Sequence, residues 1–339
     1  MSSDPSPNIL VLPHSPFFEE IMSARAIEVL ESLGTVEWNT TGRILTQNEV
    51  AERVRGCTAI LTSGGMSPVF DEELIDAADQ LRIIGYAQGS IKRYIPASVF
   101  KRGILVTHVA STMADAVAEW TLTVMLMGLR RAHTVDRAMQ AGEGWPDYTS
   151  LAPAELFRKR VGVISASHVG RAIIKLLQPF NAEILVYDPY LSVEDAAELG
   201  VRRVCALEEL MATSDVITNH APTTEETNGL LDARLWRVVK DGALFVNTAR
   251  AAAVDYDALL KELQTGRITA GLDVFPSEPL SLDSPFRNLP NVILSPHVAG
   301  RTIECQLRFG ETIADEFARF FTGEPLRHQI TGDMLLTMA

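Results

Sequence analysis

Short runs of aliphatic and β-branched residues alternate with stretches of helical periodicity along the whole chain. This alternation is typical of βαβ units, in which helices cover both faces of a buried parallel sheet. A first series of such units occupies the N-terminal third. Its predicted elements are strands over Asn8–Leu12, Ala59–Leu61, Leu81–Ile84 and Ile104–Thr107, and a helix over Phe17–Leu33.

A long helix separates this series from a second one. Apolar residues recur at helical spacing from Met113 to Met127, and Thr112-x-x-Asp115 fits a capping box at its start. Residues 141–153, rich in Gly, Pro and aromatic residues, predict a loop. Strands of the second series are predicted over Val161–Ile164, Glu183–Tyr187, Val216–Asn219, Ala243–Asn247, Ala270–Val274 and Val292–Leu294. A final helix is predicted over 302–321, with an apolar face of Ile303, Leu307, Ile313, Phe317 and Phe320.

The two series, in a chain of 339 residues that is 47% hydrophobic, predict two α/β domains. A net charge of -13 argues against nucleic-acid or anionic-membrane partners. No apolar stretch approaches the ~18 residues of a membrane span, and the N-terminus does not resemble a signal peptide. The three cysteines fit neither a disulfide framework nor a metal site, so we expect a cytoplasmic protein without a bound metal.

The turn after the predicted strand Val161–Ile164 occupies the place of a dinucleotide-binding G-x-G-x-x-G motif. Only Gly170 of the three glycines is present, and Ser165 and Ser167 stand in the other two positions. An acid, Asp188, ends the next strand, where it could accept hydrogen bonds from the adenosine ribose and repel a 2′-phosphate. This pattern favours NAD over NADP, although a plain βαβ unit with a turn aspartate would look the same.

Three ionisable residues follow strands of the second series: Arg250, Glu278 and His297. Ligands of open α/β sheets bind at the carboxyl ends of the strands, so these side chains could share one site. A histidine suits proton transfer near neutral pH, a carboxylate can fix its tautomer, and a guanidinium can hold a substrate carboxylate. Each residue alone could equally be an ordinary surface arginine, turn acid or loop histidine.

Several motifs resemble the D-isomer-specific 2-hydroxyacid dehydrogenases, which include phosphoglycerate, glyoxylate/hydroxypyruvate and D-lactate dehydrogenases. The motifs are Leu207-Glu208-Glu209-Leu210, His220-x-Pro222-x-Thr224-x-x-Thr227, Asn247-Thr248-Ala249-Arg250, Asp273-Val274-Phe275-x-x-Glu278-Pro279, Asn291-Val292-Ile293-Leu294 and Ser295-Pro296-His297. The resemblance runs from about Leu81 to Thr302. It implies hydride transfer between NAD and C2 of a small 2-hydroxy or 2-oxo acid, with His297 as acid/base, Glu278 supporting it and Arg250 binding the carboxylate.

The resemblance also implies an architecture of two Rossmann-like, doubly wound parallel-sheet domains with a cleft between them. Residues 1–107 and 299–339 would form a flavodoxin-like substrate domain, and residues 108–298 an NAD-binding Rossmann domain that also joins two copies into a homodimer. The predicted cofactor-binding residues are Ser167, His168, Val169, Asp188, His220, Ala221, Pro222, Thr227, Thr248, Ala249, Asp273, His297 and Gly300. The predicted substrate-binding residues are Ser90, Ile91, Lys92, Arg250 and His297.

The chain departs from the family pattern in three places. Ser165 and Ser167 replace glycines, and Ala251-Ala252 replaces a glycine and a small residue after the arginine. Gly89-Ser90-Ile91-Lys92-Arg93 stands where the family usually has Gly-Val-Asp, so a lysine replaces an acid beside the expected substrate. We hypothesise that Lys92 binds a second acidic or polar group of the substrate; the alternative is that it points to solvent.

Two other functions fit the same fold. Formate dehydrogenases resemble this family but have glutamine in place of Glu278, and phosphite oxidation remains an alternative. A non-enzymatic protein similar to the C-terminal-binding corepressors would bind NAD(H) as an interaction scaffold. Such a scaffold would not need Arg250, Glu278 and His297 together.

Overall fold

The structure is a computed structural model that describes residues 6–145 and 147–336. It divides into two compact units, Met1–Met113 with Arg301–Ala339 (unit 1) and Ala114–Gly300 (unit 2). The sequence placed the boundaries at 107/108 and 298/299. The first turn of the long helix belongs to unit 1, where Ser111 Oγ lies 2.8 Å from His328 Nδ1 and Thr112 Oγ1 lies 3.1 Å from Thr312 Oγ1.

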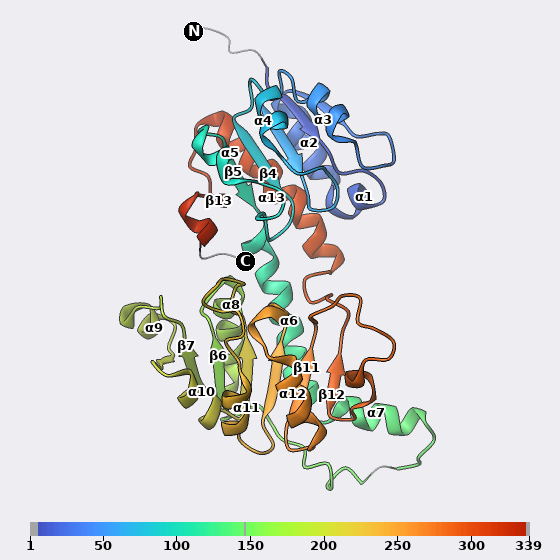
Figure 1. The fold of residues 1–339 in the computed structure, drawn as a ribbon, viewed down its shortest axis with the longest axis vertical. Helices are drawn as coiled ribbons and strands as arrows, with labels where there is room; N and C mark the ends of the chain where they lie inside the picture. The colour runs from blue at the N-terminus through green and yellow to red at the C-terminus, as the bar shows by residue number, and fades with distance from the viewer. Residues whose placement is uncertain (1–5, 146, 337–339) are drawn as a thin grey trace. The chain divides into compact units, whose positions relative to one another are not determined.

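Unit 1 is built on a six-stranded sheet (Figure 1). Its strands, in the order β13-β5-β4-β3-β1-β2, are all parallel except β13, which is antiparallel to β5. Without β13 this is the flavodoxin-like order 2-1-3-4-5. The strands are β1 (Asn8–Val11), β2 (Thr35–Trp38), β3 (Ala59–Thr62), β4 (Ile83–Tyr86), β5 (Leu105–His108) and β13 (Gln329–Ile330).

Helices cover both faces of this sheet. The core on one face joins strand residues to α3, α4 and α5, and the other face packs on α13, which also contacts α1 and α2. Gly85 in β4 lets α13 approach closely, because a Cβ there would lie 2.2 Å from Ile313 Cγ2. The helices are α1 (Phe17–Ile21), α2 (Ala24–Leu33), α3 (Gln47–Arg53), α4 (Glu72–Ala77), α5 (Ala97–Lys101) and α13 (Ile303–Thr322).

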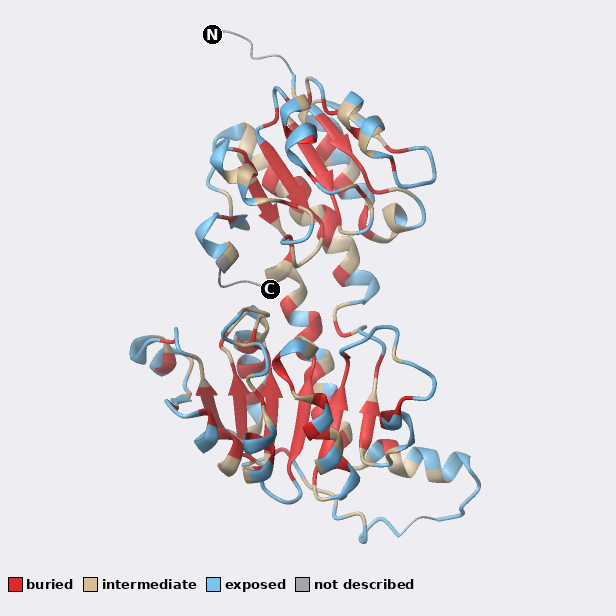
Figure 2. Ribbon diagram, viewed as in Figure 1, coloured by how far each residue is buried: buried red, intermediate tan, exposed pale blue. Residues whose placement is uncertain are grey.

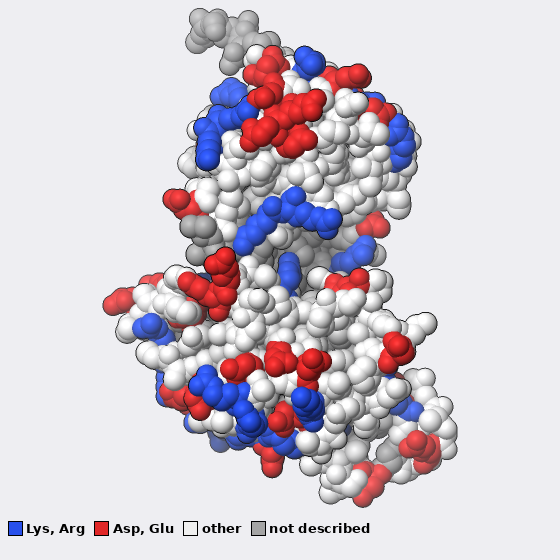
Figure 3. Space-filling model, in the orientation of Figure 1, with Lys and Arg blue, Asp and Glu red and all other residues white. Residues whose placement is uncertain are grey.

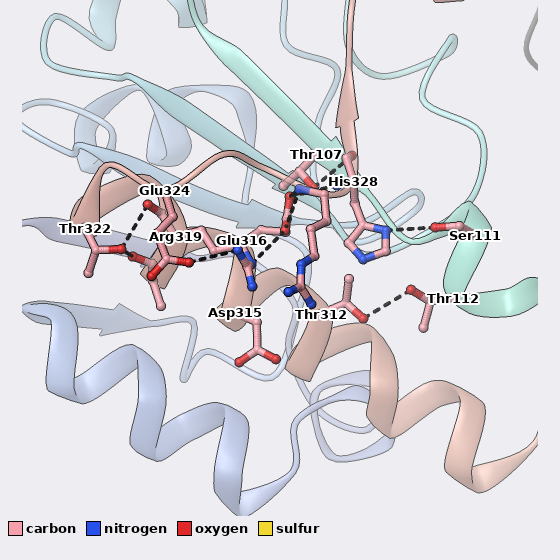
Figure 4. A network of polar contacts seen from close by, with 12 residues as sticks. Thr107, Ser111, Thr112, Thr312, Asp315, Glu316, Arg319, Thr322, Glu324 and His328 are labelled. Atoms are coloured by element: carbon pink, nitrogen blue, oxygen red, sulfur yellow. Dashed lines mark hydrogen bonds and ion pairs between the residues drawn. The ribbon is translucent and has the colours of Figure 1, made fainter.

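A buried carboxylate fastens β13 to helix α13. Glu316 is 1% exposed, and it accepts hydrogen bonds from the backbone N–H groups of Arg327 and His328 (Figure 4). The hydroxyl of Thr107 on β5 also donates to it, at 3.4 Å. These bonds supply the partners that a buried carboxylate requires, and they fix the edge strand in place.

Three sequence predictions in unit 1 were wrong. The helix expected over Phe17–Leu33 is two helices, because the chain is interrupted after Met22 and Ser23 caps a new helix by accepting from Ala26 N. Thr112 cannot start a capping box, since α6 (Ala110–Leu129) already begins before it. Ile303 does not join the apolar face of α13, because it occupies the exposed first turn of that helix.

Unit 2 is built on a seven-stranded parallel sheet with the order β12-β11-β10-β9-β6-β7-β8. Counted from β6, this is the Rossmann order 3-2-1-4-5-6 with one added strand. The order reverses between β6 and β9, which is where dinucleotides bind in such sheets. The strands are β6 (Arg160–Ile164), β7 (Glu183–Tyr187), β8 (Arg202–Arg203), β9 (Val216–Asn219), β10 (Leu244–Asn247), β11 (Thr269–Leu272) and β12 (Val292–Leu294).

Two apolar layers enclose this sheet, whose central strands β6, β9, β10 and β11 are largely buried, whereas both residues of the edge strand β8 are exposed (Figure 2). One layer contains residues of α10, α11 and α12, including the fully buried Trp236, and the other contains residues of α6 and α8. The helices are α7 (Ala132–Gln140), α8 (His168–Leu177), α9 (Val193–Glu198), α10 (Leu207–Thr213), α11 (Ala233–Val238) and α12 (Tyr256–Gln264). The fold class predicted from the sequence is therefore confirmed: both units are doubly wound α/β layers.

None of the helices within the described residues is long and apolar enough to cross a membrane.

Candidate active site

The predicted catalytic and cofactor-binding residues gather at one edge of the unit 2 sheet. Because all of its strands are parallel, the loops that follow them leave from the same edge. Arg250 follows β10, Glu278 follows β11 and His297 follows β12, while the expected dinucleotide turn follows β6.

The turn after β6 has the backbone of a dinucleotide-binding turn despite its serines. Ser165 has a φ of 74°, the left-handed conformation that favours glycine. Ser167 caps α8 by accepting from Gly170 N at 3.3 Å, and its hydroxyl donates to His220 O at 3.0 Å. A Cβ on Gly170 would lie 2.1 Å from Ser165 O, so only glycine fits there. Both substituted serines thus bond within the protein, and the turn fits a bound pyrophosphate at the start of α8.

Asp188, at the end of β7, braces this turn. Its Oδ2 accepts from Ala166 N at 2.8 Å and from Ser165 Oγ at 3.2 Å, and its Oδ1 accepts from Tyr190 N at 2.8 Å. A carboxylate has about four acceptor positions, so it retains capacity for a ribose hydroxyl. His168 is exposed and Val169 is half-buried in the first turn of α8.

The loop after β9 is held by hydrogen bonds that involve both side chains and backbone groups. His220 is 4% exposed, its Nε2 lies 2.9 Å from Thr218 Oγ1, and its backbone N–H donates to Ile164 O. Burial lowers the pKa of His220 to about 3, so the ring is neutral at neutral pH. Thr227 donates to Pro222 O at 2.5 Å and closes the loop on itself. Ala221 is buried and donates its N–H to Asn219 Oδ1 at 3.2 Å.

The loop after β10 presents Arg250. Asn247 shapes it, with Oδ1 accepting from Ala249 N and Nδ2 donating to Arg250 O, each at 3.2 Å. Thr248 Oγ1 lies 2.8 Å from Thr121 Oγ1 on α6. Arg250 itself is half-buried, and within the described residues its guanidinium donates only to Ala249 O, at 2.8 Å.

Burial lowers the pKa of Arg250, and the nearby Glu278 carboxylate partly opposes that shift. The guanidinium carries five N–H donors, so most of them remain for another acceptor. A desolvated cation with spare donors is suited to a ligand carboxylate.

His297 and Glu278 form a direct pair. His297 Nδ1 lies 2.7 Å from Glu278 Oε2, and Glu278 Oε1 accepts from Phe275 N at 2.9 Å. Burial alone would raise the pKa of Glu278, but its bonds to His297 and Phe275 bring the pKa below the ordinary value. An ionised carboxylate only accepts hydrogen bonds, so the proton of the imidazole lies on Nδ1 and Nε2 is left for exchange with a substrate.

The loop that carries His297 is anchored by Asp273. Asp273 is 1% exposed, and its Oδ1 accepts from Ser295 Oγ at 2.5 Å and Val298 N at 3.0 Å, while its Oδ2 accepts from Ala299 N at 3.1 Å. His297 N donates to Asp273 O at 2.8 Å. Asp273 is one of the predicted cofactor-binding residues. Its carboxylate accepts three hydrogen bonds from the histidine loop, and a contact with the cofactor stays a prediction.

The same loop holds an unusual backbone conformation. His297 has a φ of 56°, in the left-handed region, where a non-glycine residue persists only if its surroundings fix it. The anchor extends to α6, where Trp120 Nε1 donates to Ser295 Oγ at 3.3 Å. Gly300, the last residue of unit 2, is half-buried.

The predicted substrate-binding loop lies in unit 1, after β4. Ser90 is half-buried and Lys92 is exposed, but the side chain of Ile91 is fully buried in the core. Ile91 can therefore offer a ligand only its backbone.

Sequence reasoning named Asn247 and Ser295 only as parts of family motifs, and it assigned no supporting role to them or to Asn219, Tyr256 and Trp120. Tyr256, on α12, donates its buried hydroxyl to Val274 O and accepts from Asn247 Nδ2 at 3.3 Å. Asn219 Nδ2 donates to Asn247 Oδ1 at 3.2 Å, which ties the ends of β9 and β10 together. A polar residue at the last position of a buried strand was the available signal for both asparagines.

In the part of the chain that the structure describes, no cluster of three or more His, Cys, Asp or Glu side chains could hold a metal ion.

Residues 122–299, more than half of the 339-residue chain, match the model of the family described as "D-isomer specific 2-hydroxyacid dehydrogenase, NAD binding domain". A glyoxylate reductase of Thermofilum pendens is 34% identical over 283 residues, which cover 82% of each chain. The chain belongs to the D-isomer-specific 2-hydroxyacid dehydrogenase family. Its unit 2 contains the NAD-binding domain of that family.

The chain is similar to family members that have different names. A D-3-phosphoglycerate dehydrogenase of Archaeoglobus fulgidus is 33% identical over 312 residues, 92% of this chain. The chain spans only 58% of the length of that relative. A crystal structure of a phosphoglycerate oxidoreductase from Rhizobium etli superimposes with a TM-score of 0.80 at 27% identity, covering 95% of this chain and 97% of that one.

Proposed function

We propose that this family member is an NAD-dependent oxidoreductase that moves a hydride between the nicotinamide and C2 of a small 2-hydroxy or 2-oxo acid. The observation that carries the proposal is the pairing of His297 Nδ1 with the Glu278 carboxylate at 2.7 Å, at the same sheet edge as the half-buried Arg250. The names of the relatives, glyoxylate reductase and D-3-phosphoglycerate dehydrogenase, support the same reaction class.

Each residue has a defined task in the reducing direction. Arg250 binds the substrate carboxylate and orients the adjacent C2 carbonyl. In this direction the His297 ring starts with a proton on each nitrogen; it donates the Nε2 proton to the C2 oxygen and keeps the Nδ1 proton, through which Glu278 stabilises it. When bound, the nicotinamide supplies the hydride. The 2-oxo acid gains two electrons and two hydrogens in all and becomes a 2-hydroxy acid, and NADH becomes NAD⁺; the oxidising direction reverses each transfer.

The turn after β6 supports NAD as the cofactor. Ser165 adopts the glycine-like conformation, Ser167 caps α8, and Asp188 stands where a ribose hydroxyl is expected. A carboxylate at that point repels the 2′-phosphate of NADP, so we expect a preference for NADH over NADPH.

The test is a panel of 2-oxo acids with NADH and with NADPH, followed by absorbance at the nicotinamide band. Glyoxylate, hydroxypyruvate, pyruvate, phenylpyruvate and oxaloacetate span the range. His297→Asn is expected to lower kcat by about 10²- to 10⁴-fold. Arg250→Gln is expected mainly to raise KM, because the guanidinium holds the substrate in the ground state as well. Absence of NADH oxidation with every acid would contradict the proposal.

The same experiment separates the alternatives. A scaffold that binds NAD(H) would retain its biological effect in His297→Asn, whereas an enzyme would lose it. Formate or phosphite oxidation would appear as NAD⁺ reduction with those anions. We also propose that the protein acts in the cytoplasm.

We further propose a homodimer formed through unit 2. The segment after α6 exposes several large apolar side chains: Met139 at 46%, Trp145 at 91%, Tyr148 at 37% and Phe157 at 45%. Exposed aromatic residues gathered in one segment are typical of an interface. Analytical ultracentrifugation should give a dimer for the wild type and a weaker dimer for Trp145→Ala; a monomeric wild type would refute this assignment.

A further inference from the structure

The loops at the carboxyl ends of β3, β4 and β5 in unit 1 have an unusual charge composition. Residues 62–70, 86–96 and 107–114 contain no Asp or Glu, although the chain has 43 acidic residues. The loop after β4 contains two adjacent cations, Lys92 and Arg93, and both are exposed. Figure 3 shows that Lys and Arg side chains also gather in a band on the face of unit 1 turned to the viewer.

The loop that carries these cations is firmly braced. Ala87 N donates to Thr62 O at 2.8 Å, and His108 Nδ1 lies 2.9 Å from Gly89 O. The buried side chain of Ile91 pins the middle of the loop to the core, and Ile91 O accepts from the N–H groups of the two residues that follow Arg93. The cations are therefore held on a fixed backbone, which lowers the entropy cost of binding a ligand.

Arg93 has room for an anion. Its guanidinium carbon lies 5.8 Å from the centre of the Tyr94 ring, and no carboxylate of the described residues lies within 4.0 Å of its nitrogens. Many other arginines of unit 1 do have such a partner, including Arg25 with Asp315 at 2.8 Å. An arginine that lies near an aromatic ring and has no carboxylate partner keeps its planar set of N–H donors for a carboxylate or a phosphate.

A buried donor lies beneath the same loops. Tyr86, the last residue of β4, is 0% exposed, and its hydroxyl has no hydrogen-bond partner among the described residues. The hydroxyl faces Gly64 in the turn after β3, where a Cβ would come within 2.6 Å of it and within 2.4 Å of Gln88 Oε1. An unsatisfied buried hydroxyl is costly, and a ligand oxygen or a water molecule reaching this turn would satisfy it.

We infer that Lys92 and Arg93 form a subsite for a second anionic group, a carboxylate or a phosphate, at the end of the substrate away from C2. This inference rests on the proposed function and names the substrate class: a dianionic 2-oxo acid rather than a simple monoacid. The two loop cations are thus specificity residues, and the reduction at C2 is unchanged by them.

The charge of the whole molecule makes such a local site necessary for a dianion. With a net charge of -13 the protein repels a dianionic substrate at long range. That repulsion is screened within about 8–10 Å at physiological salt, so discrimination must come from cations in contact with the substrate. One charge-assisted contact contributes roughly a 10- to 100-fold change in affinity.

The experiment compares substrates that differ only in the second anionic group. Oxaloacetate and 2-oxobutyrate both have four carbons, and 3-phosphohydroxypyruvate and hydroxypyruvate share one carbon skeleton. With NADH, we expect kcat/KM to be at least about 10-fold higher for one dianion than for its matched monoanion. The pair that shows the larger ratio tells whether the subsite takes a carboxylate or a phosphate.

Loop variants then test the two residues. Lys92→Ala/Arg93→Ala should lower kcat/KM for the preferred dianion by about 10- to 100-fold and change the matched monoanion less than about threefold. Lys92→Arg/Arg93→Lys, which keeps both charges, should retain the preference. Lys101→Ala is the control for net charge. It removes an exposed cation at the end of α5, at the edge of the sheet opposite to the loop that carries Lys92 and Arg93.

The inference would be overturned if the dianion and the monoanion of each pair had equal kcat/KM values and the double variant left these values unchanged. That result would leave the proposed function intact. If no 2-oxo acid is reduced, the proposed function fails, and calorimetric binding of malonate still decides the subsite. Binding by the wild type that is lost in Lys92→Ala/Arg93→Ala would support the subsite, and equal or absent binding in both proteins would overturn it.

Discussion

Replacing Asp273 by asparagine tests whether this residue positions the histidine loop. The substitution keeps size and shape but exchanges one carboxylate oxygen for an NH₂ group. Oδ1 can still accept from Ser295 Oγ and Val298 N, but an amide nitrogen at the Oδ2 position would face the N–H of Ala299, which now donates to it at 3.1 Å. Two donors then oppose each other at a site that is 1% exposed.

The magnitude follows from these bonds. The loss leaves two buried donors without an acceptor, at about 1–3 kcal/mol each, and weakens two bonds that had a charged acceptor. We expect a loss of about 2–6 kcal/mol in the free energy of unfolding of unit 2. For a unit of residues 114–300 this corresponds to a fall in Tm of about 4–24 °C. A shift of the imidazole by about 1 Å would lower kcat by about 100-fold.

Differential scanning calorimetry and steady-state kinetics measure the two effects. Asp283→Asn is the matched control, since Asp283 is an exposed acid of the same unit whose carboxylate accepts from Ser281; it should change neither Tm nor kcat appreciably. If Asp273→Asn left Tm unchanged while raising only KM for NADH, the carboxylate would be a cofactor ligand and not an anchor. That result would refute the positioning role.

Three further predictions follow from contacts described above. Gly170→Ala places a Cβ 2.1 Å from Ser165 O, so we expect a loss of about 1–3 kcal/mol in the free energy of unfolding and much weaker NADH binding, measured by calorimetry. In the control variant Gly332→Ala the new Cβ lies 3.6 Å from its nearest neighbour, so this variant should be tolerated. The pKa of Glu278 is lowered in the folded state, so its pairing with His297 stabilises the protein above the unfolded-state pKa of about 4.5 and is lost as the pH falls below it. The stability difference between wild type and Glu278→Gln, from urea titrations at several pH values, should therefore be present above about pH 4.5 and shrink below it; a difference that keeps growing below about pH 4.5 contradicts the pairing. Glu316→Ala removes the acceptor of two backbone N–H groups, and hydrogen exchange should become faster at residues 327–330 with a loss of about 2–4 kcal/mol.

Buried strands were predictable because their signal, a run of apolar residues, is local. Glu183–Tyr187, Val216–Asn219 and Val292–Leu294 have the bounds expected from their apolar runs. The edge strand β2 (Thr35–Trp38) was missed, since its residues alternate between exposed and half-buried and provide no apolar run. The strand β13 was missed for another reason: it has only two residues, it is placed by the bonds of the preceding Arg327 and His328 to Glu316 on α13, and nothing in its own sequence marks it.

In the site, the residue types were predictable but their supports were not. Arg250, Glu278 and His297 stand out because each lies three to six residues after the end of a buried strand. Asp273 also follows a strand, and its place in the family motif predicts a contact with the cofactor, but its burial and its three hydrogen bonds to the histidine loop could not be predicted from the sequence. The bond from Trp120 to Ser295 spans 175 residues, and no pattern along the chain could indicate it.

The left-handed backbone at residue 297 limits how the imidazole can be probed. Asparagine, aspartate and histidine enter this conformation more readily than other side chains, and a β-branched residue would add strain of its own. A valine or isoleucine variant would therefore lose activity through a displaced loop even if proton transfer were irrelevant. His297→Asn therefore removes the proton-transferring group with little change of the backbone. In a library of variants at this position, activity will depend first on whether each side chain accepts the left-handed backbone and only then on whether it can transfer a proton.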